Sequence, residues 1–341
     1  MTRTVDRNPT HDARLDHRDG EAITDAAHVG ATHAVGAAPI ETELRCWRDA
    51  VEERLHELLP KPPAGTDAVA AAMRNAVLTP GKRIRPLLVL MTARCLGREP
   101  QRLLDAACAI ELVHAASLVL DDLPCMDDAL LRRGQPALHR AFGEDVALLA
   151  TVALLSRAYG VLAAANAIDA AARAEMVVAL ADAVGPAGLV RGQWRDLREL
   201  VDAATTGPNS NAVQAAEETN QLKTGSLFAA AFDLAAADAR ADGATRSALR
   251  SCADRIGQAF QLQDDLDDSG SFALPSAAAF GFQPDSRPTL VALLGREDAS
   301  VRLTAEIDAA KRLLQQTFGE RSVGLCRLID RISEPASQPV D

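Results

Sequence analysis

Hydrophobic residues recur every three to four positions along much of the chain, which is the period of an amphipathic helix. The first such pattern runs from Leu44 to Leu58 and ends at a cluster of prolines that begins with Pro60. Between Pro100 and Asp122, apolar residues fall on nearly every face, as expected for a central buried helix. The sequence therefore predicts an all-α protein. Further helical patterns cover residues 66–78, a segment that ends at 96–97, and residues 144–164, 169–184, 212–239, 243–268 and 302–316.

Several segments lack this periodicity. Residues 1–37 are polar and carry four of the seven histidines at irregular spacing, so we expect a disordered tail rather than a metal site. Residues 269–284 are expected to form a loop, as is the stretch TPGKRIRP that begins at Thr79. No other segment resembles a linker, so we expect a single helical domain over 38–332 and a polar tail over 333–341.

Composition supports this helical interpretation and excludes several classes of function. Hydrophobic residues make up 48% of the 341-residue chain but aromatic residues only 3%, which allows a large core poor in strand-forming residues. The formal net charge of −11 argues against nucleic acid as a partner. The longest uncharged apolar run, Val146 to Ser156, is too short to span a bilayer, so no stable membrane insertion is expected. Six scattered cysteines without CxxC pairs are typical of reduced thiols in a cytoplasmic protein.

The candidate chemistry lies where two apolar helices end in carboxylates. In the stretch LVLDDLPCMDD, Asp121 and Asp122 precede Pro124, and Asp127 follows it. Asp121 and Asp127 would point to different sides of an ideal helix. Pro124 prevents an ideal helix at this position, so a distorted helix end can bring the three carboxylates around one point.

A second group of aspartates occurs in FQLQDDLDD, where another apolar helix ends. Asp264 and Asp268 are four residues apart and share a helix face, with Asp265 beside them and Gln261 one turn earlier. Two solvated acidic helix ends are the alternative interpretation. Carboxylates gathered without cations repel one another, however, and oxygen ligands of this kind suit Mg²⁺ that bridges carboxylates to substrate phosphates.

Cationic side chains suited to phosphate occur in three short stretches of the same chain. Arginine offers phosphate a planar fork, and lysine offers a compact point charge. Only four lysines occur in the chain, and two of them fall in these stretches, which supports a role for these stretches in binding phosphate. The candidates are Lys82, Arg83 and Arg85 in GKRIRP, Arg132 and Arg133 in LRRG, and Lys223 and Thr224 in LKTGS.

These motifs, in this order, resemble those of short-chain trans-prenyl diphosphate synthases. The resemblance covers most of residues 40–295 and includes PGKRIRP, ELVHAASLVLDDLPCMDDALLRRGQPALHRAFGED, GLVRGQWRDL, NQLKTGSLF, GQAFQLQDDLDD and TLVALLG. The expanded DDxxxxD motif and the neighbouring LLATVALLSRAYG are most similar to bacterial geranylgeranyl diphosphate synthases. The resemblance implies an isoprenoid synthase-type helical bundle around a deep central cavity, Mg²⁺ as cofactor with three ions per site, and a homodimer.

The resemblance also implies substrates and residue roles. The enzyme would condense isopentenyl diphosphate with an allylic diphosphate (dimethylallyl, geranyl or farnesyl) to make geranylgeranyl diphosphate. Mg²⁺ would be held by Asp121, Asp122, Asp127, Asp264, Asp265 and Asp268, and the first five of these, with Lys223, would be the catalytic residues. The allylic diphosphate would contact Arg132, Lys223, Thr224 and Gln261. Isopentenyl diphosphate would contact Lys82, Arg85, His114 and Arg133, and Arg83 is also expected to bind substrate.

Product length is expected to depend on Ala116 and Ser117, the fifth and fourth residues before Asp121. In relatives that stop at fifteen carbons, an aromatic residue commonly plugs this level of the cavity. Both residues are small in this chain, which argues for a twenty-carbon product. A farnesyl diphosphate synthase is the alternative on this point.

A class I terpene cyclase and a non-catalytic partner subunit are two further alternatives. A cyclase needs no isopentenyl site, so GKRIRP and His114 argue against it, and the intact aspartates and Lys223 argue against an inactive subunit. One departure from the family concerns the segment after Asp268, which in relatives often carries a lysine that closes over the diphosphate. Residues 269–286 contain no lysine or arginine, and Arg287 is the candidate replacement.

Overall fold

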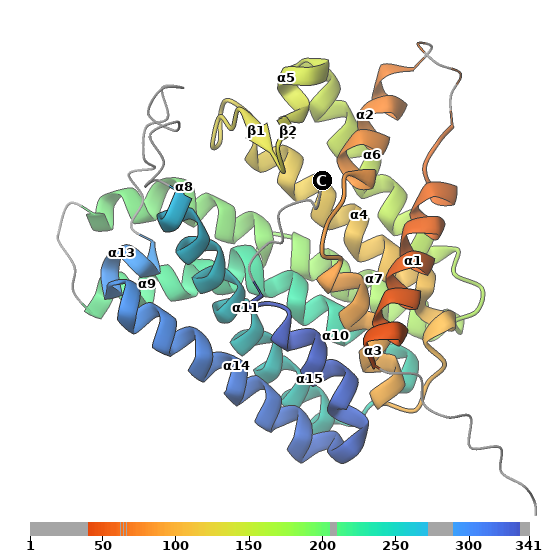
Figure 1. Ribbon diagram of the computed structural model, residues 1–341. Coiled ribbons are helices and arrows are strands. Elements are labelled where there is room, and N and C mark those ends of the chain that lie inside the picture. Colours follow the sequence, from red (N-terminus) through yellow and green to blue (C-terminus); the bar gives the residue numbers. More distant parts are fainter. Residues whose placement is uncertain are drawn as a thin grey trace, which may run out of the picture. The chain divides into compact units, whose positions relative to one another are not determined.

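The structure is a computed structural model that describes residues 40–61, 63, 65, 67–204, 210–271 and 289–334. Helices make up nearly all of this part, and within it β-structure is confined to one short hairpin (Figure 1). The predicted all-α class is confirmed. The predicted tail over 1–37 and most of the predicted loop over 269–284 lie outside the described residues.

Most predicted helices are present with bounds close to those expected. The first half of the chain forms α1 (Ile40–Leu58), α2 (Ala68–Leu78), α3 (Ile84–Cys95), η1 (Pro100–Leu103), α4 (Leu104–Asp121), β1 (Leu131–Arg132), β2 (Gln135–Pro136), α5 (Leu138–Phe142), α6 (Glu144–Ala163) and α7 (Ala170–Val184). The second half forms α8 (Leu189–Ala204), α9 (Ser210–Asn220), the π-helix η2 (Gln221–Gly225), α10 (Ser226–Ala239), α11 (Gly243–Ser271), α13 (Leu290–Leu294), α14 (Arg296–Phe318), η3 (Gly319–Ser322) and α15 (Val323–Asp330).

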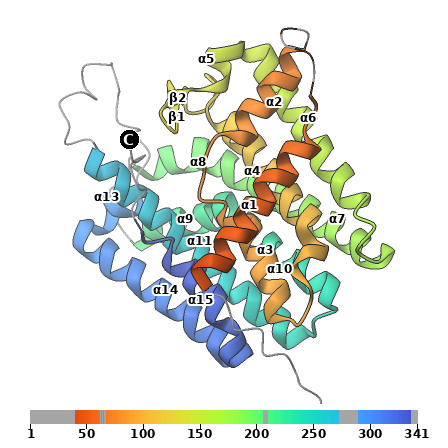
Figure 2. The same cartoon turned by 45° about the vertical axis from the view of Figure 1, so that its right-hand side comes forward.

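Helix α4 is the central helix of the bundle, as its apolar pattern predicts. It packs against α1, α2, α3, α6 and α10, and its alanines at 106, 107, 109 and 116 have no exposed surface. Small side chains allow close approach of the neighbouring helices, so α4 is enclosed on nearly all sides. Its C-terminal end and that of α11 both lie in the upper half of Figures 1 and 2, near the β1–β2 hairpin. The bundle therefore brings the two groups of aspartates to the same end.

Two helices are long and apolar enough to cross a membrane by length and composition alone. The first, Pro100–Asp121, has 67% of its apolar window buried inside the protein, which its central position explains. The second, Glu144–Ala163, is only 39% buried and exposes Leu148, Leu149 and Val152 on α6. Helix α6 therefore presents an apolar face at the surface of the described chain.

Local sequence explains where the helices near the site begin. The Asp67 side chain accepts a hydrogen bond from the backbone N–H of Ala70 at 2.9 Å and so caps α2. Helix α3 begins at Ile84, inside the stretch TPGKRIRP, so the expectation that the whole stretch is a loop is wrong. Arg83 directly before it is in the left-handed region, with φ of 50°.

All six cysteines are free, in agreement with the prediction of reduced thiols. Cys95, Cys108, Cys252 and Cys326 are buried, and Cys46 and Cys125 are exposed. Burial raises the pKa of the Cys95 thiol to about 12 and raises the pKa of the other three buried thiols as well.

Candidate active site

The first group of aspartates lies at a tight turn that ends α4. The backbone N–H of Asp127 donates to the carbonyl of Asp121 at 2.9 Å, which brings the chain back to the helix end after Pro124. Burial raises the pKa of Asp121 to about 6, against the opposing effect of the nearby Lys223 ammonium. Charge repulsion from Asp127 raises it further.

Asp122 is buried and faces the β1–β2 hairpin. Its carboxylate accepts hydrogen bonds from Nε of Arg132 at 2.9 and 3.2 Å and from Nη2 of the same guanidinium. The hairpin turn places Arg133 and Gly134 in the left-handed region, with φ of 51° and 75°. The turn thus directs the Arg132 guanidinium at the C-terminal end of α4, where a cation is favourable.

Lys223 of the π-helix η2 connects the first aspartates to α8. Its Nζ lies 2.7 Å from the Asp196 carboxylate and 3.9 Å from that of Asp121. Burial opposes a charge on the lysine, but the field of Asp121 and Asp196 prevails and raises the pKa of Lys223. The lysine is therefore a fixed ammonium beside Asp121.

The next residue in η2, Thr224, connects to the second group of aspartates instead. Its hydroxyl donates to Oε1 of Gln261 at 3.1 Å, and Nε2 of Gln261 donates to Oδ1 of Asp265 at 2.9 Å. The other oxygen of Asp265 accepts from the backbone N–H of Leu290 at 3.2 Å. Two adjacent residues of η2 thus connect to the two acidic groups, Lys223 directly and Thr224 through Gln261. The side chain of Asp268 is outside the described part.

A separate cationic cluster lies between α3, α4 and the hairpin, with Arg85 as its centre. Arg85 is 6% exposed, and its guanidinium carbon lies 4.4 Å from the ring centroid of Phe228 and 5.3 Å from that of Phe260. Burial lowers the pKa of Arg85 to about 10. Its Nη1 lies 3.4 Å from Nε2 of His114, and among the described residues its Nε has no hydrogen-bond partner.

His114 and Arg133 complete this cluster. Burial, together with Arg85 and Arg133, lowers the pKa of His114 well below its ordinary value, so the imidazole is neutral. Arg133 donates to the carbonyls of Thr79 at 3.3 Å and Pro80 at 3.2 Å. A Cβ at Gly81 would lie 2.7 Å from the Arg133 guanidinium, so the glycine of PGKRIRP makes room for it.

The two other bases of GKRIRP point elsewhere. Arg83 is buried, donating to Glu111 at 2.6 Å and Glu52 at 2.7 Å and to the carbonyl of Val77. Lys82 is accessible, and its Nζ donates to the backbone carbonyl of Glu334 at 2.8 Å. Lys82 is therefore accessible to solvent, whereas the Arg83 side chain is enclosed by protein.

The acidic groups suit Mg²⁺ without forming a complete metal cage. Within the described ranges, no three His, Cys, Asp or Glu side chains gather around one metal-sized point. Mg²⁺ keeps several waters and is usually bound by one or two carboxylates plus substrate phosphates, so such a cage is not required. The oxygen-only donors and the desolvated carboxylate of Asp121, which a cation would stabilise, fit this metal.

Asp196 is a residue of this site that the charge pattern did not identify. It stands alone between Arg195 and Leu197 in GLVRGQWRDL, and α8 itself was not predicted. The family resemblance of that stretch was the signal that could have found it. Its partner Lys223 lies 27 residues later, so only the fold brings them together.

Comparison with known proteins agrees with this arrangement of an all-α bundle with two acidic helix ends and nearby cations. The sequence model of the polyprenyl synthetase family matches residues 66–272. A geranylgeranyl diphosphate synthase of Pantoea ananas is 44% identical over 266 residues, covering 77% of this chain and 84% of the relative. That of Pseudescherichia vulneris is 45% identical over 282 residues, covering 82% and 87%. The chain belongs to the polyprenyl synthetase family.

Solved structures show the same fold. The crystal structure of an apo FPP/GFPP synthase from Zymomonas mobilis superposes with a TM-score of 0.73 at 32% identity, covering 86% of this chain and 98% of that one. Among sequence relatives, a farnesyl diphosphate synthase of Geobacillus stearothermophilus is 34% identical over 295 residues, covering 85% of this chain and 97% of the relative. The resemblance stated from the motifs is confirmed, and relatives of two product lengths match over most of their sequences.

Proposed function

We propose that this protein is a Mg²⁺-dependent geranylgeranyl diphosphate synthase that condenses isopentenyl diphosphate with allylic diphosphates. The observation that carries the proposal is the presence of two separate charged regions, each of which suits a diphosphate. One is the pair of acidic groups linked through Lys223 and Thr224, and the other is the cationic cluster around Arg85. A reaction that joins two diphosphate esters needs both.

The first site suits the allylic diphosphate, whose carbon–oxygen bond breaks. Bound Mg²⁺ would neutralise negative charge that develops on the leaving diphosphate. The Lys223 ammonium beside Asp121 and the Thr224 hydroxyl beside Gln261 can each donate to this diphosphate, and Arg132 can transfer hydrogen bonds from Asp122 to a phosphate oxygen. These donors stabilise the departing group without covalent chemistry by the protein.

The second site orients isopentenyl diphosphate. Arg85, His114 and Arg133 hold its diphosphate, with Lys82 at the rim, so that its double bond can attack the allylic cation. A new carbon–carbon bond forms, and a proton leaves the adjacent carbon for an oxygen of the released diphosphate. Apolar side chains of the bundle keep water away from the cation.

Arg83 is assigned a different role from the substrate contact expected for it. Its side chain is 1% exposed and is enclosed by Glu111, Glu52 and backbone carbonyls. We therefore assign it to fixing the start of α3, which carries Arg85. The other assignments follow the sequence expectations, including Asp121, Asp122, Asp127, Asp264, Asp265 and Asp268 as Mg²⁺ ligands.

The test is a direct assay of purified protein with Mg²⁺, isopentenyl diphosphate and each allylic diphosphate in turn. Chromatography of the dephosphorylated products is expected to show geranylgeraniol from dimethylallyl, geranyl and farnesyl starters. Farnesol as the end product would instead identify a farnesyl diphosphate synthase. Cyclic hydrocarbons would indicate a terpene cyclase, which the second diphosphate site argues against. No product from any starter would indicate a non-catalytic subunit.

Product length is proposed to depend on the wall formed by α4 below Asp121. Ala116 is fully buried, whereas Ser117 is partly exposed and its hydroxyl donates to the carbonyl of His114 at 2.8 Å. Ala116→Tyr is expected to shorten the product, and Ser117→Phe tests the same wall with less displacement of packed neighbours. An unchanged twenty-carbon product from both variants would show that this part of α4 does not set product length.

We also propose a homodimer, in which α6 of one subunit covers α6 of the other. Leu148, Leu149 and Val152 are 48%, 57% and 66% exposed and share one face of α6. A self-complementary apolar face of this kind is typical of two-fold dimers. Sedimentation is expected to show twice the chain mass, and binding to lipid vesicles would instead favour a membrane as the occupant. The single-domain organisation over 38–332 and a cytoplasmic location stay predictions.

A further inference from the structure

The π-helix η2 carries Lys223, which lies beside Asp121, and Thr224, which connects to Asp265 through Gln261, and glycines of neighbouring helices contact its backbone. Its sequence is QLKTG, and it joins α9 directly to α10. A π-helix in the middle of a helix is rare, and such distortions occur frequently at functional sites. The wider turn also needs support from its neighbours, because its geometry is less favourable than that of an α-helix.

On one side, η2 lies against α8 at Gly192. A Cβ at Gly192 would lie within 3.0 Å of three backbone atoms of Leu222 and Lys223. Backbone atoms cannot move aside as the end of a flexible side chain can. The contact at Gly192 therefore has no room for any side chain, and it fixes the backbone of Lys223 against α8.

On another side, η2 lies against α11 at Gly257. A Cβ at Gly257 would lie 2.8 Å from the Cα of Gly225, the last residue of η2. Gly225 itself is next to the side chain of Gln221, whose Oε1 would be 2.6 Å from an added Cβ. The contact between Gly257 and Gly225 is therefore again one of backbone with backbone.

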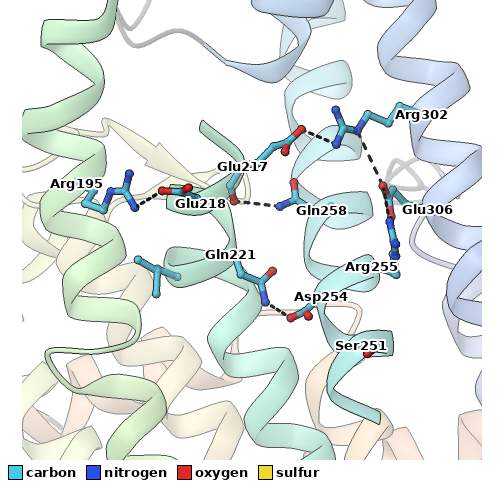
Figure 3. A pocket seen from close by; sticks show the side chains of 11 residues that line it. Arg195, Glu217, Glu218, Gln221, Ser251, Asp254, Arg255, Gln258, Arg302 and Glu306 are labelled. Atoms are coloured by element: carbon cyan, nitrogen blue, oxygen red, sulfur yellow. Dashed lines mark hydrogen bonds and ion pairs between the residues drawn. The ribbon is translucent and has the colours of Figure 1, made fainter. Parts of the chain in front are cut away.

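A third side of η2 is held through Gln221, at the edge of a polar pocket of about 570 Å³ (Figure 3). The Gln221 amide donates to Asp254 of α11, and nearby Arg195 of α8 pairs with Glu218 of α9 at 3.1 Å. These polar contacts span the same helices as the glycines. They occupy the side of η2 that faces the pocket, so that the π-helix is fixed on all three sides.

Each of the two glycines stands one helical turn before the residue that bonds to η2. Gly192 precedes Asp196, the partner of Lys223, by four residues on α8. Gly257 precedes Gln261, the partner of Thr224, by four residues on α11. Residues four apart lie on the same helix face, so the glycine contact sets the distance at which the bonding side chain meets η2.

We infer that Gly192 and Gly257 are positioning residues that fix Lys223 and Thr224 for the allylic diphosphate. This inference rests on the proposed function of the two acidic groups. Adding one methyl group at either position must separate a helix from η2, because no side chain there can yield. Lys223 would then move away from Asp196 and Asp121, or Thr224 from Gln261.

The test compares Gly192→Ala, Gly257→Ala and Gly225→Ala with Gly243→Ala, which lies at the start of α11 with nothing within 4 Å of its added Cβ. A displacement of about 1 Å can reduce a rate by about 100-fold, so Gly192→Ala is expected to lower kcat/KM for the allylic substrate by about that factor. Gly257→Ala should lower it less, and Gly225→Ala least, since only the Gln221 side chain has to move. The KM for isopentenyl diphosphate should stay unchanged in all four.

A crystal structure of each variant separates this inference from the proposed function. In Gly192→Ala the Lys223 ammonium is expected to lie beyond hydrogen-bond reach of Asp196, whether or not the protein turns over prenyl substrates. If that distance is unchanged, or if Gly192→Ala and Gly257→Ala retain the kinetic constants of the control, the inference is overturned. If Gly192→Ala does not fold, Gly257→Ala decides the question by the distance from Thr224 to Gln261. A wild-type protein without activity would refute the proposed function alone.

Discussion

The acidic groups at the ends of α4 and α11 and the cationic cluster around Arg85 both contain buried charges, but these charges are compensated differently. Asp122 is paired with Arg132, and Asp121 lies beside Lys223. Arg85, by contrast, lies against two adjacent aromatic rings and beside a neutral histidine. One region is already paired within the protein, while in the other Glu111 and Asp264 offset the cost of burying the Arg85 charge only in part, since burial still lowers its pKa.

This difference indicates two ways of preparing a site for diphosphate. In the acidic region, metal and substrate must exchange partners with existing ion pairs, so binding involves local rearrangement. In the cationic cluster, the donors are held by packing and by backbone carbonyls, and an anion can bind without displacing a carboxylate. The first region therefore suits the group that leaves, and the second suits the substrate that must stay in place.

The largest effect is expected from Asp121→Asn in the acidic region. Metal ions stabilise transition-state charge by several kcal/mol, so loss of this ligand is expected to lower kcat about 1000-fold. The affinity for isopentenyl diphosphate should remain, because the cationic cluster is untouched. Asp105→Asn on the same helix, whose carboxylate pairs with Arg54, is the control for loss of one charge from α4. Equal loss of isopentenyl diphosphate binding would show that the two regions are not independent.

A smaller effect is expected from Arg85→Met in the cationic cluster. Removing one charged partner of a buried anion costs about 2 kcal/mol or more, which corresponds to a KM for isopentenyl diphosphate about 30-fold higher. The substrate-free protein should melt at a higher temperature, because an incompletely compensated buried cation has been replaced by an apolar side chain. Steady-state kinetics and thermal melts measure both effects. A lower melting temperature would mean that Arg85 stabilises the fold before any anion binds.

Protons and Mg²⁺ compete for the Asp121 carboxylate, so pH should change the apparent affinity for Mg²⁺ about tenfold. The pKa of Asp121 is raised to about 6 from 3.8, so the folded protein binds this proton more tightly than the unfolded chain. Without metal, stability should therefore decrease as the pH rises from about 4 to about 6. Apparent Mg²⁺ affinity should increase about tenfold between about pH 5 and 7, since the ion binds the ionised carboxylate. Calorimetric titration measures this, and Asp121→Asn should remove the dependence.

The smallest effect on the reaction is expected from Glu111→Gln, which alters the support of the cationic cluster rather than the cluster itself. Loss of one partner of the buried Arg83 should lower the free energy of unfolding by about 3 kcal/mol in urea denaturation. Glu52→Gln, at a partly exposed carboxylate, is the milder control. Both KM values should change less than about threefold. A rise in the KM for isopentenyl diphosphate like that of Arg85→Met would show that Arg83 contacts substrate after all.

The sequence predicted the helices that carry an apolar pattern and the residues that lie in charged groups. Helix α4 and the aspartates at its end were identified because burial on all faces and a proline in an acidic stretch are both local signals. Helix α8 was missed although its apolar residues recur at helical spacing, because charged residues separate them along GLVRGQWRDLREL, and backbone contact at Gly192 holds the helix against η2. The β1–β2 hairpin depends on two left-handed residues, Arg133 and Gly134, of which only the glycine is a turn signal.

The direction in which a side chain points could not be predicted from local pattern. Arg83 and Arg85 stand two residues apart in one motif, and both suit phosphate by residue type. One faces Glu111, 28 residues later, and the other faces Phe228 and Phe260. Which of them meets an acid depends on contacts between helices that the sequence separates widely, and the same is true of Lys223 and Asp196.

The distribution of thiols makes the acidic region accessible to spectroscopy. Cys125 is exposed within the turn between Asp122 and Asp127, while the four buried thiols have raised pKa values that suppress the reactive thiolate. With Cys46 replaced by serine, a thiol-reactive fluorophore would attach at Cys125 alone. Its emission would report each rearrangement of the turn in real time, without any need to follow product.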